Sequence, residues 1–236
     1  EIVALCDIKP ERAEKKKLTR PHAKQLVQLR PTTERYADVF RALGFPFSLA
    51  HTLQKEDMPY SKKVDALLQK KSRKIGIAPF AQHAFKVFPL AKMEALVSTL
   101  AAQGFELYIF GGGKQEKTIA DSWATANKNT HNTIGELSLT EELGLIAQVD
   151  LMLSMDSAGM HMASLVGTRC ISIWGATHPY AGFLGYGQSL DDCIQVDHPN
   201  RPNSVYGNKP CNCDGTEAID LVTNVMVLEK IKSIFL

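Results

Sequence analysis

The sequence has no apolar run of the roughly 18 residues that a membrane-spanning helix requires, and its start shows no signal-peptide pattern. Cysteine is also scarce: the 236 residues include five, an odd number that is unevenly spread. A disulfide framework would need paired, regularly spaced cysteines, so this usage fits a reducing compartment. These absences lead us to expect a cytoplasmic protein.

An excess of charge of one sign is lacking as well. The 27 Lys and Arg residues nearly balance the 25 Asp and Glu residues, which leaves a formal net charge of +2. Nucleic-acid-binding domains usually carry a strong basic excess, so we expect no nucleic-acid partner. The one dense basic stretch, KPERAEKKKLTR at 9–20, is more typical of a solvated face or loop than of a binding patch.

From residue 74 onward, apolar runs alternate regularly with helical patterns. Short runs typical of buried strands occur at 74–80, 105–110, about 133–134, 150–155 and 169–174. The segments between most of them have the length of crossover helices, and the nearly continuous apolar character of the runs indicates strands that are covered on both faces. We therefore predict an α/β fold, a Rossmann-like doubly wound parallel sheet over about 72–200.

The rest of the chain divides into two parts. Residues 1–71 hold a strand candidate at 2–6 and a helix candidate at 32–44, too little for a second doubly wound domain. We interpret them as the truncated end of a domain whose beginning is missing, followed by a linker. The end of the chain is amphipathic, which predicts one unit over 72–218 and a helix over 219–236 that packs back across the domain interface.

Three polar or glycine-rich segments follow predicted strands directly. They are Gly111–Gly113, Asp156–His161 and Gly175–His178. In open parallel sheets, ligands bind beyond the carboxyl ends of the strands, near the point where the strand order reverses. We therefore expect these three segments to line one crevice.

The segment MDSAGMH at 155–161 lies where a buried strand turns into a helix. A helix amino terminus offers free N–H groups and a positive dipole end, which together bind anions. Ser157, Ala158 and Gly159 are small enough for a phosphate to approach the backbone, His161 lies one turn along, and Asp156 can cap the helix or accept a ligand hydroxyl. The alternative is that Asp156 and Ser157 only cap the helix and that His161 is an ordinary surface residue.

The stretch LSMDSAGMHMASLVGTRCISIWGATHP resembles the signature of glycosyltransferase family 9, the bacterial heptosyltransferases of lipopolysaccharide core synthesis. Two further stretches resemble the same family in the expected order, IGIAPFAQHAFKVFPLAKMEALVSTLAAQGFELYIFGGG and IGELSLTEELGLIAQVDLMLSMDS. The resemblance covers about 74–185, and the C-terminal helix also fits.

The resemblance implies the C-terminal, donor-binding domain of a two-domain GT-B glycosyltransferase, with 1–71 as a remnant of the acceptor-side domain. It implies inverting, metal-independent transfer of a sugar without a cofactor, from a nucleoside diphosphate donor, most typically ADP-heptose, to a lipid-linked or saccharide acceptor of the lipopolysaccharide type. A peripheral association with the cytoplasmic face of the inner membrane is compatible with such an acceptor.

By the same resemblance, Lys86 of KVFP would contact the donor phosphates. Asp156, Ser157 and the backbone of Ala158 and Gly159 would hold the diphosphate or reach the sugar, with His161 beside them. The family's general base is an Asp in a glycine-containing loop near the start of the N-terminal domain, and nothing in 1–71 matches that loop. We therefore expect the base to lie in a missing segment and this chain to bind donor without transferring sugar.

The sequence departs from the family pattern in two places. Ala158 stands where the family has the first glycine after Asp-Ser, and Gly159 follows one position later. The loop after the first strand carries Phe80, Gln82 and His83 in place of small residues. These departures leave open which contacts this loop makes with phosphate, and which donor is bound.

Further candidates have weaker support from the sequence. Glu116, behind the glycine turn, is a candidate for a ribose hydroxyl, and Thr177 and His178 are candidates for the sugar. The CNC motif at 211–213 lacks a second ligand pair and is interpreted as incidental thiols, so no metal site is predicted.

The rival functions are a nucleotide-sugar epimerase of GT-B-like shape, which needs carboxylates around the sugar, and a non-catalytic nucleotide-binding module. The donor sugar, the base, the acceptor and the oligomeric state stay open.

Overall fold

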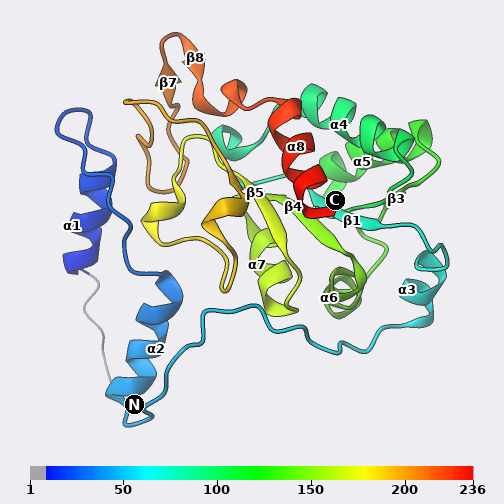
Figure 1. Ribbon diagram of the computed structural model, residues 1–236, viewed down its shortest axis with the longest axis horizontal. Helices are drawn as coiled ribbons and strands as arrows, with labels where there is room; N and C mark the ends of the chain where they lie inside the picture. Colours follow the sequence, from blue (N-terminus) through cyan, green and yellow to red (C-terminus); the bar gives the residue numbers. More distant parts are fainter. Residues whose placement is uncertain (1–8, 236) are drawn as a thin grey trace.

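The computed structural model describes residues 9–235, and its centre is a six-stranded sheet (Figure 1). The strands are β1 (Lys74–Ala78), β2 (Glu106–Ile109), β3 (Thr130–Asn132), β4 (Leu151–Met155), β5 (Cys170–Ile173) and β6 (Cys193–Ile194). Four of them fall within the predicted apolar runs, and β3 ends one residue before its predicted position. The predicted strand at 2–6 lies outside the described residues.

The strands lie in the order β3-β2-β1-β4-β5-β6, and every neighbouring pair is parallel. From β1 the chain moves outward to β2 and β3, then returns to the other side of β1 to form β4, β5 and β6. β1 and β4 are thus neighbours in the sheet although two strands separate them in the sequence. The strand order reverses between them, which is where such folds bind ligands.

Helices cover both faces of the sheet, which confirms the predicted doubly wound fold (Figure 1). One face packs against α4 (Leu90–Ala102), α5 (Lys114–Ala126) and α8 (Asn224–Phe235). The other packs against α3 (Lys62–Leu67), α6 (Leu139–Gln148) and α7 (Ala158–Leu165). Helix α6 begins with a capping box in which Ser138 and Glu141 each bond the other's backbone N–H.

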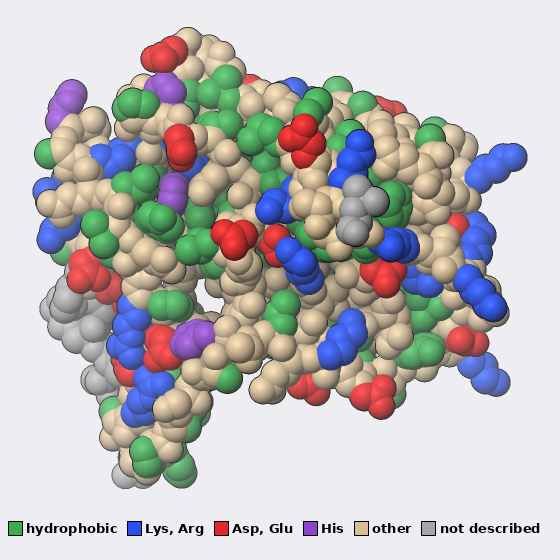
Figure 2. All heavy atoms as spheres, in the orientation of Figure 1, with side chains coloured by type: hydrophobic (Ala, Val, Ile, Leu, Met, Phe, Trp, Pro, Cys, Tyr) green, Lys and Arg blue, Asp and Glu red, His purple; other side chains and the backbone are tan. Residues whose placement is uncertain are grey.

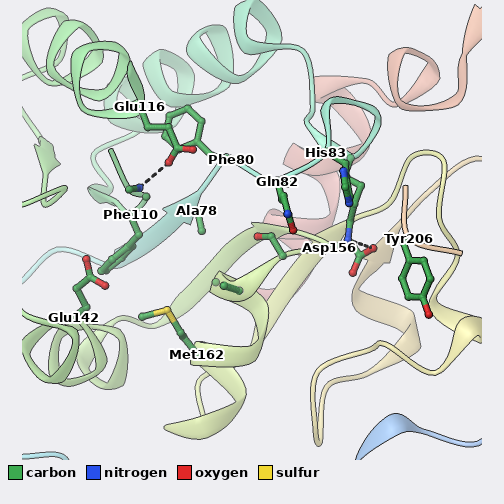
Figure 3. A pocket seen from close by; sticks show the side chains of 17 residues that line it. Ala78, Phe80, Gln82, His83, Phe110, Glu116, Glu142, Asp156, Met162 and Tyr206 are labelled. Atoms are coloured by element: carbon green, nitrogen blue, oxygen red, sulfur yellow. Dashed lines mark hydrogen bonds and ion pairs between the residues drawn. The ribbon is translucent and has the colours of Figure 1, made fainter. Parts of the chain in front are cut away.

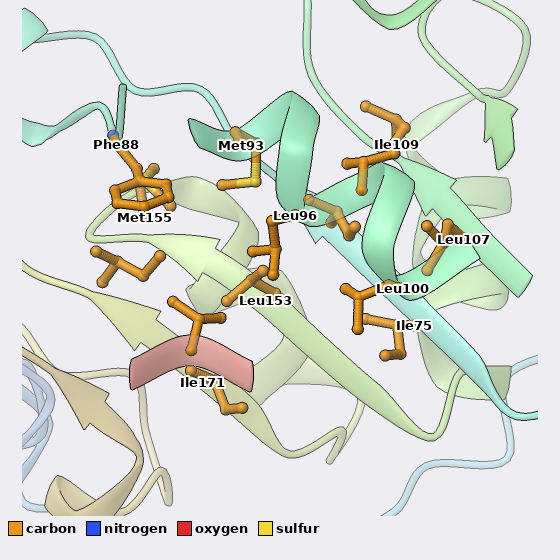
Figure 4. Packing of buried hydrophobic residues seen from close by; sticks show 14 of the residues in the cluster. Ile75, Phe88, Met93, Leu96, Leu100, Leu107, Ile109, Leu153, Met155 and Ile171 are labelled. Carbon is orange, nitrogen blue, oxygen red and sulfur yellow. The ribbon is translucent and has the colours of Figure 1, made fainter. Parts of the chain in front are cut away.

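Alternate residues of the strands supply the two core layers. Ile75 and Ile77 of β1 lie in the cluster that includes Leu96 of α4 (Figure 4). Gly76 faces the opposite layer, where an added Cβ would lie 2.2 Å from Sδ of Met152. Any side chain at Gly76 would therefore collide with Met152 of the adjacent strand β4. Glycine leaves the space that this methionine occupies.

Residues 9–71 form α1 (Lys9–Leu18), α2 (Thr32–Ala42) and α3, with no strand among them. Helix α2 confirms the predicted helix at 32–44, and the basic run is mostly the exposed part of α1. The segment joining α2 to α3 runs along the α7 and α6 side of the molecule, where the Glu56 N–H donates to the Val166 carbonyl at 3.3 Å (Figure 1). The Leu29 and Thr32 N–H groups donate to the carbonyls of Tyr180 and Gly182, so the amino-terminal part is tied to the sheet unit at several points.

The end of the chain differs from the predicted helix over 219–236. Residues Ala218–Leu221 form a short 3-10 turn, and Val222 is extended, so the α-helix begins only at Asn224. Ile219 of this turn packs into the core, where it fills the space beside Gly175. Helix α8 then packs on α4 and the sheet through Val227 and Ile231.

The surface carries both charges in a mixture. On the face that Figure 2 shows, basic and acidic side chains alternate without a large field of one sign. No helix within residues 9–235 has the length and apolar character to cross a bilayer.

Candidate functional site

A cleft of about 480 Å³ opens at the carboxyl ends of β1, β2 and β4, around the point where the strand order reverses (Figure 3). It brings together six residues predicted from the sequence: Lys86, Glu116, Asp156, Ser157, Ala158 and Gly159. Phe80, Gln82 and His83 of the loop after β1 also line it. Two of the three predicted strand-end segments therefore contribute to one concave site, while the third, Gly175–His178, does not line it.

The amino terminus of α7 is open towards this cleft. Ser157 precedes the helix in an extended conformation, and its hydroxyl makes no capping bond but lies 3.3 Å from that of Ser154. None of the residues that the structure describes accepts a hydrogen bond from the amide N–H of Ser157, Ala158 or Gly159. Free amides at the positive end of a helix form an anion-binding site.

Gly159 has a packing role at this terminus. A Cβ added to it would lie 2.4 Å from Cβ of Ala78 and 2.9 Å from Oγ of Ser154, so a side chain there would push α7 away from β1. Ala158, in contrast, is exposed at the cleft. The shifted glycine of this sequence is therefore explained by the contact between helix and strand.

Lys86 and Asp156 form an ion pair inside the cleft. The ammonium Nζ lies 2.8 Å from Oδ2 of Asp156, and the two side chains are 17% and 5% exposed (Figure 3). The Thr177 hydroxyl donates to the same oxygen at 2.8 Å. Lys86 reaches this place from the short 3-10 helix Ala84–Lys86, and its alkyl chain packs on Gly207.

The loop after β5 is held by a buried guanidinium. Arg201 is 3% exposed and donates to the carbonyls of Gly175 at 2.6 Å and of Thr177 at 2.8 Å. It also donates to the Gln195 side chain at 2.8 Å, and burial lowers its pKa to about 10. Because Arg201 fixes the backbone of Thr177, it also fixes the hydroxyl that Thr177 presents to Asp156.

The structure corrects the expectation for Thr177 and His178. Both are buried, at 0% and 4% exposure, and neither lines the cleft. His178 Nδ1 accepts the Tyr180 N–H at 3.1 Å, and burial, together with nearby Arg201 and Lys24, lowers the His178 pKa to about 3. Both side chains point into the protein, where they make hydrogen bonds. Thr177 therefore acts on the site only through Asp156.

His161 and Glu116 lie at the margins of the site. His161 is exposed and lines a smaller adjoining cavity of about 270 Å³, which shares Lys86 and Asp156 with the cleft. Glu116 lines the cleft, but its Oε2 accepts the Gly112 N–H at 2.7 Å and so holds the glycine turn. One oxygen of the Glu116 carboxylate is thus already hydrogen-bonded within the protein.

Six residues that line the cleft were not among the predicted site residues: Ala78, Ala81, Phe110, Glu142, Met162 and Tyr206. Phe110 ends the run at 105–110, so the strand-end rule should have included it. Glu142 and Met162 lie on α6 and α7, and Tyr206 on the long loop after β6. Their positions depend on packing, which no local pattern in the sequence indicates.

The thiols of the CNC motif lie apart from the cleft. Cys211 and Cys213 are buried and pack with Ala176 and Ala218. Across residues 9–235, no group of three or more His, Cys, Asp or Glu side chains is placed to hold a metal ion.

A family model described as glycosyltransferase family 9 (heptosyltransferase) matches residues 12–210. Lipopolysaccharide heptosyltransferase 3 of Escherichia coli is 32% identical over 106 residues, which are 44% of this chain and 31% of that protein. Lipooligosaccharide heptosyltransferase 2 of Haemophilus influenzae is 28% identical over 131 residues, or 53% of this chain and 38% of its own length. The matches thus span about a third of these two relatives.

Solved structures share the fold. The ADP-heptose lps heptosyltransferase II of E. coli superposes with a TM-score of 0.64 at 19% identity, over 87% of this chain and 62% of its own. A family 9 glycosyltransferase of Veillonella parvula gives a TM-score of 0.67 at 15% identity, over 88% and 60%. The described part of the chain therefore shares the fold of about 60% of each of these two structures.

We predict that Thr177→Val destabilises the protein by about 1–3 kcal/mol, because the isosteric change leaves a buried Asp156 oxygen without its hydroxyl donor. Urea unfolding measures the loss. The exposed Thr118, whose hydroxyl bonds the Lys114 carbonyl within one helix turn, supplies the control Thr118→Val, with an expected change within about 0.5 kcal/mol. Equal stability of Thr177→Val and the native protein would contradict this role of Thr177.

Proposed function

The chain belongs to glycosyltransferase family 9, and from this premise we propose that its cleft binds the nucleotide-sugar donor of a sugar transfer. The donor we propose is ADP-heptose, and the acceptor is a saccharide of the lipopolysaccharide type, presented at the cytoplasmic face of the inner membrane. The names of the two relatives support the acceptor class. The bound ADP in a solved E. coli heptosyltransferase of the same fold supports the nucleotide.

One observation carries the proposal: the open amino terminus of α7 and the ammonium of Lys86 face the same cleft. A diphosphate placed there receives backbone N–H groups from one side and a cation from the other. An ammonium has three donors, so Lys86 can bond a phosphate oxygen while it keeps its bond to Asp156. The carboxylate then positions the lysine as well as neutralising it.

The same groups suit the chemistry of transfer. When the bond between the sugar and the diphosphate breaks, the leaving group gains negative charge, and prearranged donors stabilise that charge without a metal ion. His161 and the smaller cavity beside Lys86 and Asp156 are where we place the sugar. Inversion follows if an acceptor hydroxyl attacks from the side opposite the diphosphate.

Deprotonating that hydroxyl requires a carboxylate or imidazole within hydrogen-bond reach. We assign no general base among the cleft carboxylates. Asp156 is held by Lys86 and Thr177, and Glu116 by Gly112. Glu142, the third, lies at the far end of the cleft, well apart from Asp156 (Figure 3). An epimerase needs free carboxylates around the sugar ring, and among the described residues the smaller cavity offers Asp156 alone, which is already paired with Lys86. The proposal therefore assigns this cleft the donor half of the reaction.

We expect Lys86→Met to weaken ADP binding about 10- to 100-fold, equivalent to about 1.5–3 kcal/mol for a charge-assisted hydrogen bond. Calorimetric titration in the presence of EDTA measures the affinity, and thermal unfolding checks that the variant is folded. Lys128→Met is the matched control, since Lys128 is exposed and lies on the loop after α5, away from the cleft. Unchanged affinity in Lys86→Met would remove this lysine from the site.

A second variant separates binding from folding. Ala158→Asp places a negative charge in the first turn of α7, where it favours the helix by about 0.3–1 kcal/mol and repels a diphosphate. We expect ADP affinity to fall at least about tenfold while the melting temperature is kept or rises. Ala158→Ser is the uncharged control and should bind as the native protein does. Native affinity in Ala158→Asp would show that the phosphates bind elsewhere.

A further inference from the structure

The cleft has a second end that differs in character from the Lys86 end. Phe80, Phe110 and Met162 line it with apolar and aromatic surface, and Figure 3 shows Phe110 and Met162 well apart from Asp156. Phe80 is itself fixed by stacking on Trp123, with ring centroids 6.2 Å apart and planes 11° from parallel. A flat heterocycle suits such a surface, because aromatic and thioether groups pack on ring faces.

Two acidic side chains, Glu116 and Glu142, lie at this end, and Glu116 already accepts the Gly112 N–H. Glu142 projects from α6 towards Phe110 and is half-buried, and its carboxylate has no hydrogen-bond or ion-pair partner among residues 9–235 (Figure 3). Its neighbour Glu141 is different, because its carboxylate bonds Ser61 and closes the capping box with Ser138. The two adjacent glutamates thus have different roles. Glu141 stabilises the start of α6, and Glu142 presents an unpaired carboxylate to the cleft.

Burial raises the pKa of Glu142, which reflects the cost of holding a charge at this place without a partner. A ligand that donates a hydrogen bond would offset that cost. Tertiary structure supplies Glu142 no such donor within the described residues, so the partner has to come from whatever fills the cleft.

The two ends fix the direction in which a nucleotide lies. A diphosphate at Lys86 and the start of α7 leaves the base to extend towards Phe110 and Met162. We propose that Glu142 reads the base there, accepting a hydrogen bond from an exocyclic amino group and so selecting an amino-bearing base such as adenine. This inference rests on the proposed function and adds the group that decides which nucleotide is bound.

The selection has a simple physical basis. A carboxylate only accepts hydrogen bonds, so a base with a carbonyl oxygen at that position meets a second acceptor and leaves both groups unpaired. Sites built to hydrogen-bond a ligand group reject analogues that lack it more strongly than apolar pockets reject a missing methylene.

The test compares ADP with inosine diphosphate, in which a carbonyl oxygen replaces the amino group and the adjacent ring nitrogen N1 carries a hydrogen. We expect the native protein to prefer ADP about 10- to 100-fold by calorimetric titration. Glu142→Gln should bring the two affinities within about threefold, since a carboxamide can turn to donate or accept. Glu94→Gln changes an exposed glutamate of α4 and should keep the native preference.

The outcomes separate the two claims. If the native protein binds both nucleotides equally, or if Glu142→Gln keeps the preference for ADP, the role of Glu142 is overturned while the donor site stands. If the native protein binds neither nucleotide, the donor site is overturned and the role of Glu142 with it. Loss of the preference in Glu142→Gln, with its retention in Glu94→Gln, supports the inference.

Discussion

The helix dipole and free amides at the start of α7 are the feature on which the site depends. They face a cleft because the chain leaves β1 and β4 towards opposite faces of the sheet, to α4 on one side and α7 on the other. The space between the two exits is not filled by a crossover. The topology therefore creates both the concave site and the partial positive charge inside it.

Around that terminus, a chain of paired polar groups holds the charged side chains in place. Arg201 fixes the loop that carries Thr177, Thr177 bonds Asp156, and Asp156 orients Lys86. Buried charges are costly unless they are paired and hydrogen-bonded, so removing one member weakens the hold on the next. The network consequently positions Lys86 in the cleft through contacts within the protein alone.

Much of the fold follows from the sequence because buried parallel strands are nearly continuous apolar runs, and β1, β2, β4 and β5 fall inside the predicted ones. The strand-end rule places the segment 156–159 at the cleft, whereas Lys86 is expected there only from the resemblance to the family. Thr177 was misplaced because strand ends say where the backbone emerges but not which way a side chain turns. Its direction is set by Arg201, 24 residues further along the chain. Glu142 is not predictable from the sequence, because only tertiary packing brings α6 to the cleft.

The most direct test of the anion site is an NMR titration of the ¹⁵N-labelled protein with ADP. We predict that the amide signals of Ser157, Ala158 and Gly159 shift first and saturate together, with smaller changes at Gly111 and Gly112 of the glycine turn. Saturating shifts confined to other parts of the protein, with these three amides unmoved, would contradict the claim that the start of α7 binds the diphosphate.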